Sequence, residues 1–595
     1  MKKIFFKYWK EICSLLFGIV LLIFWTVPHV SLLAYQEQYQ LFLFSGDYLL
    51  QRLALPGGLA DYIAEFFTQF NYLYVVGGFL LSSLLVLLQI QTWRLCSKHG
   101  TDELWFPLSF LPSVFVWAYM SDSNVMLSFL VALNLVLLLM SWYDFSLKLW
   151  QKIVWIVCAT PIAFWLLGPV SFVFLLYVSL GEKSKGLKTV SWCLAALLYG
   201  ILLIILTSYI IPYPLSRLLC GLNYYRYPEY SPFIQFFIIA FVALLPLLLS
   251  LLPLKRIKIV LPAQLVIVVL GSGALIHFVY SGLNTELIEY DYLVRMQQWD
   301  KIISKAEKKQ PTTPMEVSCV NFALSQQGQL GDRLFEFYQN GEEGLFPTFT
   351  RDMTSPVSTG EIFFQLGMVN DACRYFFEAQ EAIPNFRKSG RLMMRIIQCN
   401  IINGQYAVAK KYLWMLQKSL FYRQWANEQL TMLQNPSSIN SDPLYSKLRR
   451  YRFSKDFLFS DREMDQMLGL LYTHCYSNRN AFEYLMSYEL VQRDMAKFMK
   501  YYPLGKYAGY TDHIPYAFQQ ALLYYWTQSH GSFEGMPWSI DEQWMQSMST
   551  FIQTYMRDKN DESLKIGPLS KTFWSYMLVN KETTDKSKKE MKTIY

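Results

Sequence analysis

The stretch IVWIVCATPIAFWLLGPVSFVFLLYVSL, residues 153–180, decides the fold of this chain. It carries no charged residue, and Gly168-Pro169 interrupts it near its middle. An uncharged apolar run of this length is either one kinked membrane-spanning helix or two spans joined by a tight hairpin. The two alternatives place everything that follows on opposite sides of a membrane.

Apolar runs of the same kind precede and follow this stretch, and from Asn284 onward no run is long enough to cross a bilayer. With the hairpin, the sequence predicts about nine spans. The candidate spans are Ile12–Leu33, Tyr72–Ile90, Trp105–Met120, Val125–Met140, Ile153–Leu167, Val170–Leu180, Val190–Ile211, Phe233–Leu252 and Ile259–Tyr280.

Composition therefore divides the chain into two unlike parts. Of its 595 residues 53% are hydrophobic and 16% are charged, but the apolar runs all lie in the first half. We predict an all-α fold with a transmembrane helical domain at 1–282 and a water-soluble helical domain at 283–580. The lysine-rich tail at 581–595 is predicted to be disordered. The formal charge of +8 is modest, and no nucleic-acid partner is indicated.

The distribution of lysine and arginine decides between the hairpin and the kinked helix. Short cytoplasmic loops carry the positive excess, and with a hairpin fourteen Lys and Arg fall on one side against three on the other. The three are Arg52, Arg217 and Arg226. This asymmetry favours the hairpin, a cytoplasmic N-terminus and a periplasmic C-terminal half. The fourteen are Lys2, Lys3, Lys7, Lys10, Arg94, Lys98, Lys148, Lys152, Lys183, Lys185, Lys188, Lys255, Arg256 and Lys258.

Two loops on the periplasmic side are long, at 34–71 and 212–232. The first has apolar residues at helical spacing and is predicted to form short amphipathic helices lying in the membrane interface, with Pro56-Gly57-Gly58 as a turn. Asp61 and Glu65, four residues apart, are expected on the wet face of such a helix.

The soluble half carries the spacing of a tetratricopeptide-like repeat. Ala372, Phe376, Ala379 and Pro384 follow the A-x3-F-x2-A-x4-P pattern, with Gly367 at the turn between two helices. The stretch NGQYAVAKKYLWMLQKS, residues 403–419, repeats the pattern more loosely. Stacked helix pairs of this kind bury a continuous core. The number of repeats after residue 430 stays open.

The nine cysteines show no CxxC spacing and the six histidines are scattered, so we predict neither a metal site nor a cofactor.

Three stretches together carry a resemblance to a known family. They are LPGGLADYIAEFFTQFNYLYVVGG at 55–78, GQYAVAKKYLWMLQKSLFYRQWA at 404–426 and HIPYAFQQALLYYW at 513–526. They resemble an uncharacterised bacterial family of polytopic inner-membrane proteins with a domain of unknown function. The resemblance implies an envelope protein of a Gram-negative bacterium and no particular activity. A looser architectural likeness is to membrane glycosyltransferases that use lipid-phosphate sugars.

Three functions are compatible with these features, and whether the chain is an enzyme stays open. The first is an envelope scaffold whose repeat domain binds a periplasmic protein or peptide. The least favoured is a transporter, because charged residues are scarce within the predicted spans.

The function ranked second, after the scaffold, is that of a glycosyltransferase-like enzyme acting on a polyprenyl-phosphate sugar at the periplasmic face. That chemistry needs a carboxylate as general base or ligand of a divalent cation, and cations for the lipid phosphate. Arg52, Arg217 and Arg226 are the candidate phosphate-binding residues. Asp122 is also a candidate cap of the fourth span. The candidate carboxylates are Asp47, Asp122, Glu37, Asp61 and Glu65.

Cysteine labelling from either side of the membrane tests the predicted orientation. A cysteine introduced at Lys185 should react only from the cytoplasm, and one at Gln405 only from the periplasm, because the positive excess orients the spans. A cytoplasmic Gln405 would overturn both the hairpin argument and the periplasmic assignment.

Overall fold

The computed structural model describes residues 2–181, 187–227, 233–251, 260–281, 285–453, 460–510 and 513–579. Every regular element in these ranges is a helix, and the one extended contact is an isolated bridge between Val125 and Tyr225. The all-α prediction is confirmed for this part of the chain. The tail at 581–595 and the basic residues at 183, 185, 255, 256 and 258 lie outside it.

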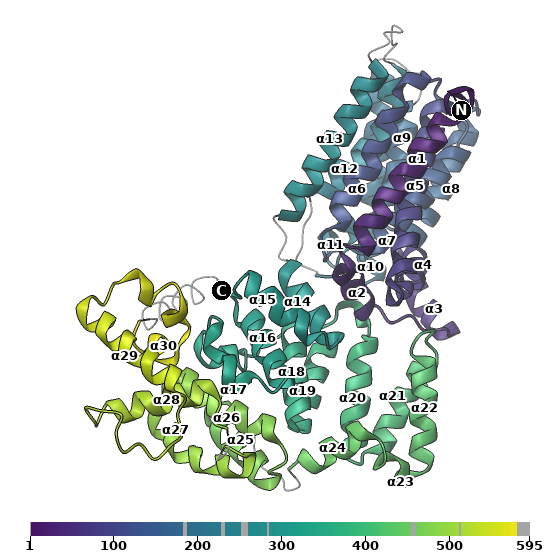
Figure 1. Ribbon diagram of the computed structural model, residues 1–595. Coiled ribbons are helices and arrows are strands. Elements are labelled where there is room, and N and C mark those ends of the chain that lie inside the picture. Colours follow the sequence, from purple (N-terminus) through teal and green to yellow (C-terminus); the bar gives the residue numbers. More distant parts are fainter. Residues whose placement is uncertain are drawn as a thin grey trace. The chain divides into compact units, whose positions relative to one another are not determined.

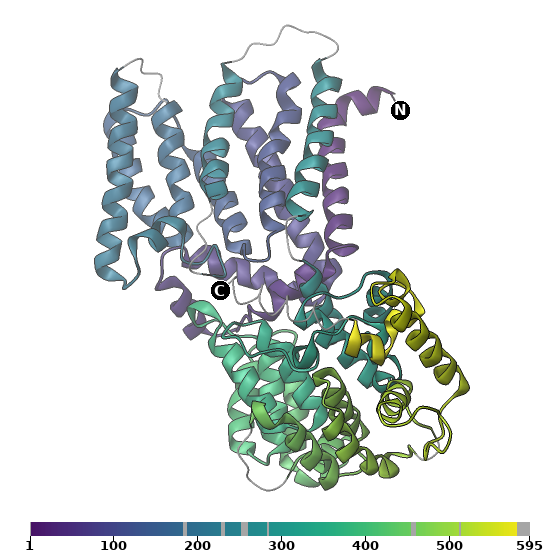
Figure 2. The same ribbon diagram turned by 90° about the vertical axis from the view of Figure 1, so that its left-hand side faces the viewer.

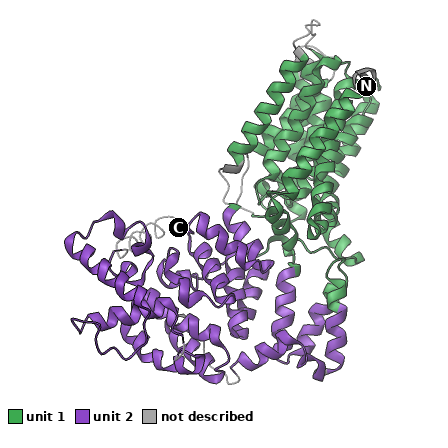
Figure 3. Cartoon of the chain, in the orientation of Figure 1, with its two compact units in different colours: residues 1–285, 383–390, 414–426 green, residues 286–382, 391–413, 427–595 purple. Residues whose placement is uncertain are grey.

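The chain divides into two compact units (Figure 3). Unit 1 comprises Met1–Thr285, Ile383–Gly390 and Trp414–Ala426, and unit 2 comprises Glu286–Ala382, Arg391–Leu413 and Asn427–Tyr595. Two short segments of the C-terminal half, 383–390 and 414–426, therefore belong to the same unit as the apolar helices.

Unit 1 contains five helices that are long and apolar enough to cross a membrane, and they run alongside its shorter helices (Figure 1 and Figure 2). The segment of α5 is 44% buried, whereas the other four are at most 17% buried and turn apolar side chains outward. Such surfaces are stable in lipid and identify a membrane-associated protein. The five are α1 (Lys2–Thr26), α5 (Tyr74–Lys98), α8 (Leu149–Leu167), α10 (Leu187–Ile210) and α13 (Val260–Ser281).

The other predicted spans are shorter helices. With 10 residues each, α6 and α9 reach about 15 Å, half the thickness of the hydrocarbon core. Nine complete crossings therefore stay a prediction. The short apolar helices are α6 (Leu111–Met120), which follows η2 (Glu103–Phe110), α7 (Leu127–Trp142), α9 (Phe172–Gly181) and α12 (Phe233–Ser250).

The stretch at 153–180 is a hairpin. Helix α8 ends at Leu167, Gly168 has φ 83°, and η3 (Pro169–Ser171) leads into α9. The ring centroids of Trp155 in α8 and Phe174 in α9 lie 5.7 Å apart. In one continuous helix these residues would be about 28 Å apart. The predicted hairpin is confirmed.

Short helices join the first two spans. The predicted first span, Ile12–Leu33, is wrong at its end, because α1 stops at Thr26 and the chain starts again after Pro28 as α2. The loop at 34–71 is helical as predicted, and α11 (Leu215–Cys220) lies in the second long loop. The helices of the first loop are α2 (Val30–Gln38), α3 (Gly46–Leu53), α4 (Gly58–Thr68) and η1 (Gln69–Tyr72).

Glycines fix where α4 begins. A Cβ at Gly58 would lie 1.9 Å from the carbonyl oxygen of Arg52, so no larger residue fits. Gly57 has φ 84°, and its N–H donates to the carbonyl of Trp165 in α8 at 2.9 Å. The Trp165 indole donates to the carbonyl of Leu53 at 2.9 Å. These contacts seat the start of α4 against the end of α8.

Unit 2 contains the helix pair predicted from the repeat spacing. Gly367 ends the first helix with φ 91°, and Ala372 and Phe376 of the second are fully buried. A Cβ at Gly360 would lie 2.8 Å from the Phe376 ring, so a small residue is required there. The principal helices are α14 (Thr285–Arg295), α15 (Trp299–Lys308), α16 (Pro314–Gln326), α18 (Ser355–Leu366), α19 (Val369–Glu381), α20 (Gly390–Ile402), α21 (Tyr406–Leu416), α22 (Arg423–Gln434), α24 (Pro443–Tyr451), α25 (Met464–His474), α26 (Arg479–Gln492), α27 (Met495–Tyr501), α28 (Tyr516–Thr527), α29 (Glu542–Arg557) and α30 (Phe573–Leu578).

A buried acid makes the stability of unit 2 depend on pH. Glu489 of α26 is fully buried, and neither of its carboxylate oxygens has a hydrogen-bond partner among the described residues. Burial raises its pKa to about 8, against the opposing charge of Lys497. The folded state therefore binds this proton more tightly than the unfolded state, and the stabilisation is lost as pH rises from about 4.5 toward 8.

Glu489→Gln should remove this dependence and raise the free energy of unfolding at pH 8 by about 1–3 kcal/mol, because the amide cannot ionise. Thermal unfolding of the full chain in detergent across this pH range measures the effect, with exposed Glu534→Gln as the control. Parallel pH profiles for the wild type and Glu489→Gln would contradict the prediction.

Candidate functional site

Two carboxylates of α4 form the centre of the candidate site in unit 1. Asp61 and Glu65 lie one helical turn apart and are 1% and 0% exposed. The expectation that they form the wet face of an interfacial helix is wrong. Both meet Arg387, which enters unit 1 on the segment 383–390 and so compensates their charge.

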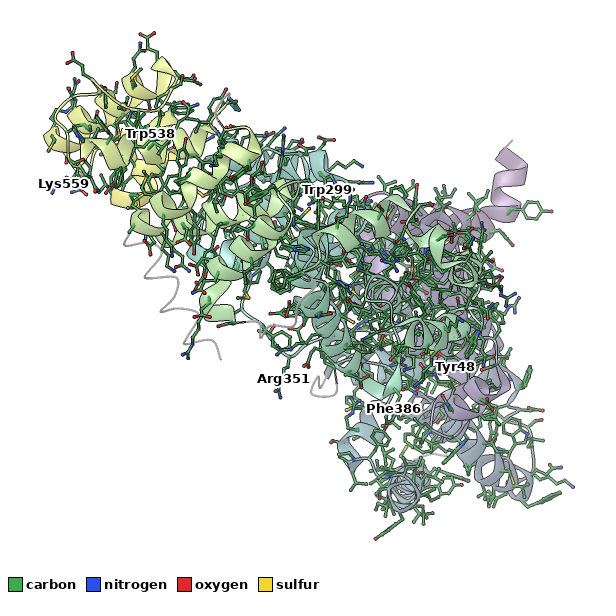
Figure 4. All side chains as sticks on the ribbon, turned by 90° about the horizontal axis from the view of Figure 1, so that it is seen from below. Tyr48, Trp299, Arg351, Phe386, Trp538 and Lys559 are labelled. Carbon is green, nitrogen blue, oxygen red and sulfur yellow. The ribbon has the colours of Figure 1, made fainter. Side chains whose placement is uncertain are left out.

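Five side chains form one buried ion network, namely Tyr48, Arg52, Asp61, Glu65 and Arg387. Arg387 donates from Nη2 to Asp61 Oδ1 at 2.5 Å and from Nε to Glu65 Oε1 at 2.8 Å. Arg52 Nε donates to Glu65 Oε2 at 2.9 Å and lies 3.8 Å from Asp61 Oδ2. The Tyr48 hydroxyl also donates to Glu65 Oε2. Figure 4 labels Tyr48 of the network and Phe386 of the segment that carries Arg387.

The network balances two guanidinium groups against two carboxylates. Although burial disfavours its charge, the Glu65 carboxylate holds the pKa of Arg52 above its usual value. The pKa of Arg387 is raised in the same way by Asp61 and Glu65. Burial raises the pKa of Asp61 to about 6, against the opposing charge of Arg387. Both arginines therefore stay charged, and Asp61 is the member that titrates nearest neutral pH.

The two carboxylates differ in how many of their oxygens accept hydrogen bonds. Both oxygens of Glu65 accept hydrogen bonds, from Arg387 on one side and from Arg52 and Tyr48 on the other. Asp61 Oδ2 accepts no hydrogen bond from the described residues. A proton can be bound at Asp61 Oδ2 without breaking a hydrogen bond.

The other candidate carboxylates lie apart from the network. Glu37 is buried in α2 and accepts from the hydroxyl of Tyr422 at 2.5 Å. Asp47 is exposed in the first turn of α3, which Ser45 caps. Asp122 accepts from the backbone N–H of Asn124 at 2.9 Å.

Asp122 does not cap the fourth predicted span. The corresponding helix, α7, begins at Leu127 behind Met126, and no side chain caps it. Asp122 instead closes a turn within the loop after α6. The closeness of SDSN to the next apolar run suggested a cap, but four residues separate Asp122 from the start of the helix at Leu127.

The three candidate phosphate-binding arginines have different surroundings. Arg52 belongs to the buried ion network, where it pairs with Glu65 and Asp61. Arg226 is buried, its guanidinium lies 4.8 Å and 5.0 Å from the ring centroids of Tyr35 and Tyr39, and Nη2 donates to Gln36 Oε1 at 2.9 Å. Its Nε has no hydrogen-bond partner, and no acidic side chain of the described ranges pairs with it.

Arg217 of α11 is half-buried. Burial lowers the pKa of Arg217 and of Arg226, and the charge of Arg387 lowers both further. Arg387 therefore repels both Arg217 and Arg226, and among the described residues the region around Arg387 carries more positive than negative charge. Such a region favours a bound anion.

Sequence reasoning did not find Arg387, Tyr48 or Tyr422. Arg387 lies 322 positions beyond Glu65, and no local pattern connects them. One signal was present in the sequence. Two carboxylates one turn apart repel each other, so helix α4 can be buried only if cations from elsewhere meet it.

Arg387→Gln should destabilise unit 1 by about 3–5 kcal/mol, because it leaves two buried carboxylates with one cation. Adding Asp61→Asn to it should recover part of the loss. Unfolding of the full chain in detergent measures both, with exposed Arg423→Gln of the neighbouring segment as the matched control, expected within about 0.5 kcal/mol of wild type. If Arg387→Gln were as stable as the control, the network would not hold unit 1 together.

Comparison with known proteins places the whole chain in one family. No group of three or more His, Cys, Asp or Glu that could hold a metal ion occurs in the described residues. No curated protein and no solved structure matches the chain. Residues 5–580 match a family described as "Family of unknown function (DUF6057)", which spans both units. The chain belongs to the DUF6057 family of unknown function.

Proposed function

We propose that this protein is a multi-pass inner-membrane scaffold of the cell envelope that presents its helical module to a periplasmic protein or peptide. The observation that carries the proposal is the buried ion network. It uses the carboxylates of the first loop to hold a segment of the C-terminal half within the membrane unit.

Burial and pairing argue for a structural use of these carboxylates. A general base must come within hydrogen-bond reach of the proton it removes. Asp61 and Glu65 are almost completely inaccessible, and Glu65 has no oxygen without a hydrogen bond. Their pairing instead stabilises one geometry of the loop.

The helices of unit 2 supply a surface suited to binding. Buried ion pairs connect three of them: Arg391 Nη1 lies 2.8 Å from Asp291 Oδ2, and Arg395 Nη2 lies 2.8 Å from Glu361 Oε2. Paired helices such as α18 and α19 stack into arrays whose exposed faces bind peptides and helices. We therefore assign the tetratricopeptide-like module the role of partner binding.

A second candidate is an enzyme that uses a polyprenyl-phosphate sugar at the periplasmic face. The positive excess around Arg387 favours it, since Arg226 Nε has no hydrogen-bond partner in the part of the chain that the structure describes and guanidinium groups bind phosphate oxygens well. Asp47 or Asp122 would be the general base or a ligand of a divalent cation.

Complementation of a deletion strain at equal protein abundance separates the two candidates. For a scaffold, Asp47→Asn, Asp122→Asn and Arg226→Gln should complement fully. Val408→Asp with Lys411→Glu, on the exposed face of α21, should fail because it alters the binding surface while leaving the core intact.

For the enzyme the pattern is reversed, with a loss of about 10²–10⁴ in rate when the base or ligand is replaced by an amide. Full activity of the α21 variant together with loss in Asp122→Asn or Arg226→Gln would reject the scaffold. Tyr406→Phe on the same helix tests whether any change in α21 disturbs function.

A further inference from the structure

The segment that delivers Arg387 has a strained backbone at one place. In η6 (Pro384–Phe386), Asn385 has φ 59° and Phe386 has φ 57°. Two consecutive residues other than glycine in the left-handed region are uncommon, and a bulky aromatic is an outlier there. Strain of this kind persists only where surrounding contacts hold it in place.

Such contacts lie on both sides of Phe386. The Asn385 side-chain amide donates to the carbonyl of Leu222 at 2.9 Å and to Asn223 Oδ1 at 3.2 Å. Arg387 is fixed by the buried ion network, and the carbonyl of Lys388 accepts from the N–H of Leu41 at 2.9 Å. Because its neighbours are both tied inward, the Phe386 side chain is directed outward.

Phe386 is 91% exposed, the highest value of any large apolar side chain described. An aromatic ring held in water by a strained backbone costs free energy in two ways. Its apolar surface is exposed to water, and its backbone has an unfavourable φ angle. The position therefore calls for apolar surroundings that the described residues do not provide.

Connectivity places this position next to the membrane surface. Asn385 bonds to Leu222, which follows α11, and α11 begins five residues after α10 ends at Ile210. Since α10 is apolar enough to span a bilayer, α11 lies at the level where this span ends. Leu215 and Leu219 on α11 are also exposed, so apolar side chains from both segments share this level.

We propose that Phe386 is a bilayer anchor whose ring enters the boundary between headgroups and acyl chains in the leaflet where α10 ends. Aromatic side chains are stable at this depth. Lys388 lies two residues after Phe386, and Arg217 on α11 is close enough to Arg387 to be affected by its charge, so both cations suit anionic headgroups. The segment 383–390 thereby attaches to lipid as well as to α4. This attachment does not depend on the protein or peptide that the helical module of unit 2 is proposed to bind.

Photo-crosslinking in the full-length chain tests this anchor. The photoreactive analogue p-benzoyl-phenylalanine is placed at 386 and the protein is reconstituted in vesicles of phosphatidylethanolamine and phosphatidylglycerol. Position 267, exposed on the span α13, is the lipid-facing reference, and position 556, exposed on α29 of unit 2, is the water-facing reference. Resistance of each variant to trypsin verifies that the fold is retained.

Lipid adducts at 386 should approach the level at 267 and exceed those at 556 by about tenfold, in line with the preference of a phenylalanine side chain for apolar surroundings. Adducts to protein only would mean that another polypeptide, or a second copy of the chain, covers the ring. Adducts at the level of position 556 would mean that the ring stays in water. Either result overturns the proposal.

Discussion

Arg387 meets Asp61 and Glu65 inside unit 1, and the arrangement of the first loop depends on this contact. Without it, α4 would bury two negative charges against Arg52 alone, at a cost that apolar packing of one short helix cannot offset. With it, α4 can lie against the end of α8, where Gly57 and Gly58 allow close approach. The position of α3 follows, because Arg52 and Tyr48 both bond to Glu65.

The same contact explains why the candidate phosphate-binding arginines are not equivalent. The charge of Arg52 is already paired with Glu65, so Arg52 stabilises the loop and is poorly suited to bind a phosphate. Arg226 is held by two aromatic rings and one amide, none of which carries charge. No acidic side chain of the described residues therefore compensates its charge, and Arg387 nearby adds to the positive potential.

The elements that could be predicted from the sequence are those set by local composition. Apolar length located the helices of the membrane half, and charge asymmetry together with Gly168-Pro169 indicated the hairpin that Trp155 and Phe174 confirm. The repeat spacing located α18 and α19. The wet-face interpretation of Asp61 and Glu65 failed because helical periodicity identifies a polar face but not the partner that covers it. That partner, Arg387, lies in a loop with no periodicity of its own.

The order of synthesis gives the ion network a further consequence. Glu65 leaves the ribosome 322 residues before Arg387 does. Throughout that interval α4 has one cation for two carboxylates and is more stable in water than buried. The apolar helices that follow α4 can form as they are made, but the first loop cannot reach its final packing until synthesis has passed residue 387. Packing of the first loop therefore depends on completion of a segment that is made long after every apolar helix of unit 1.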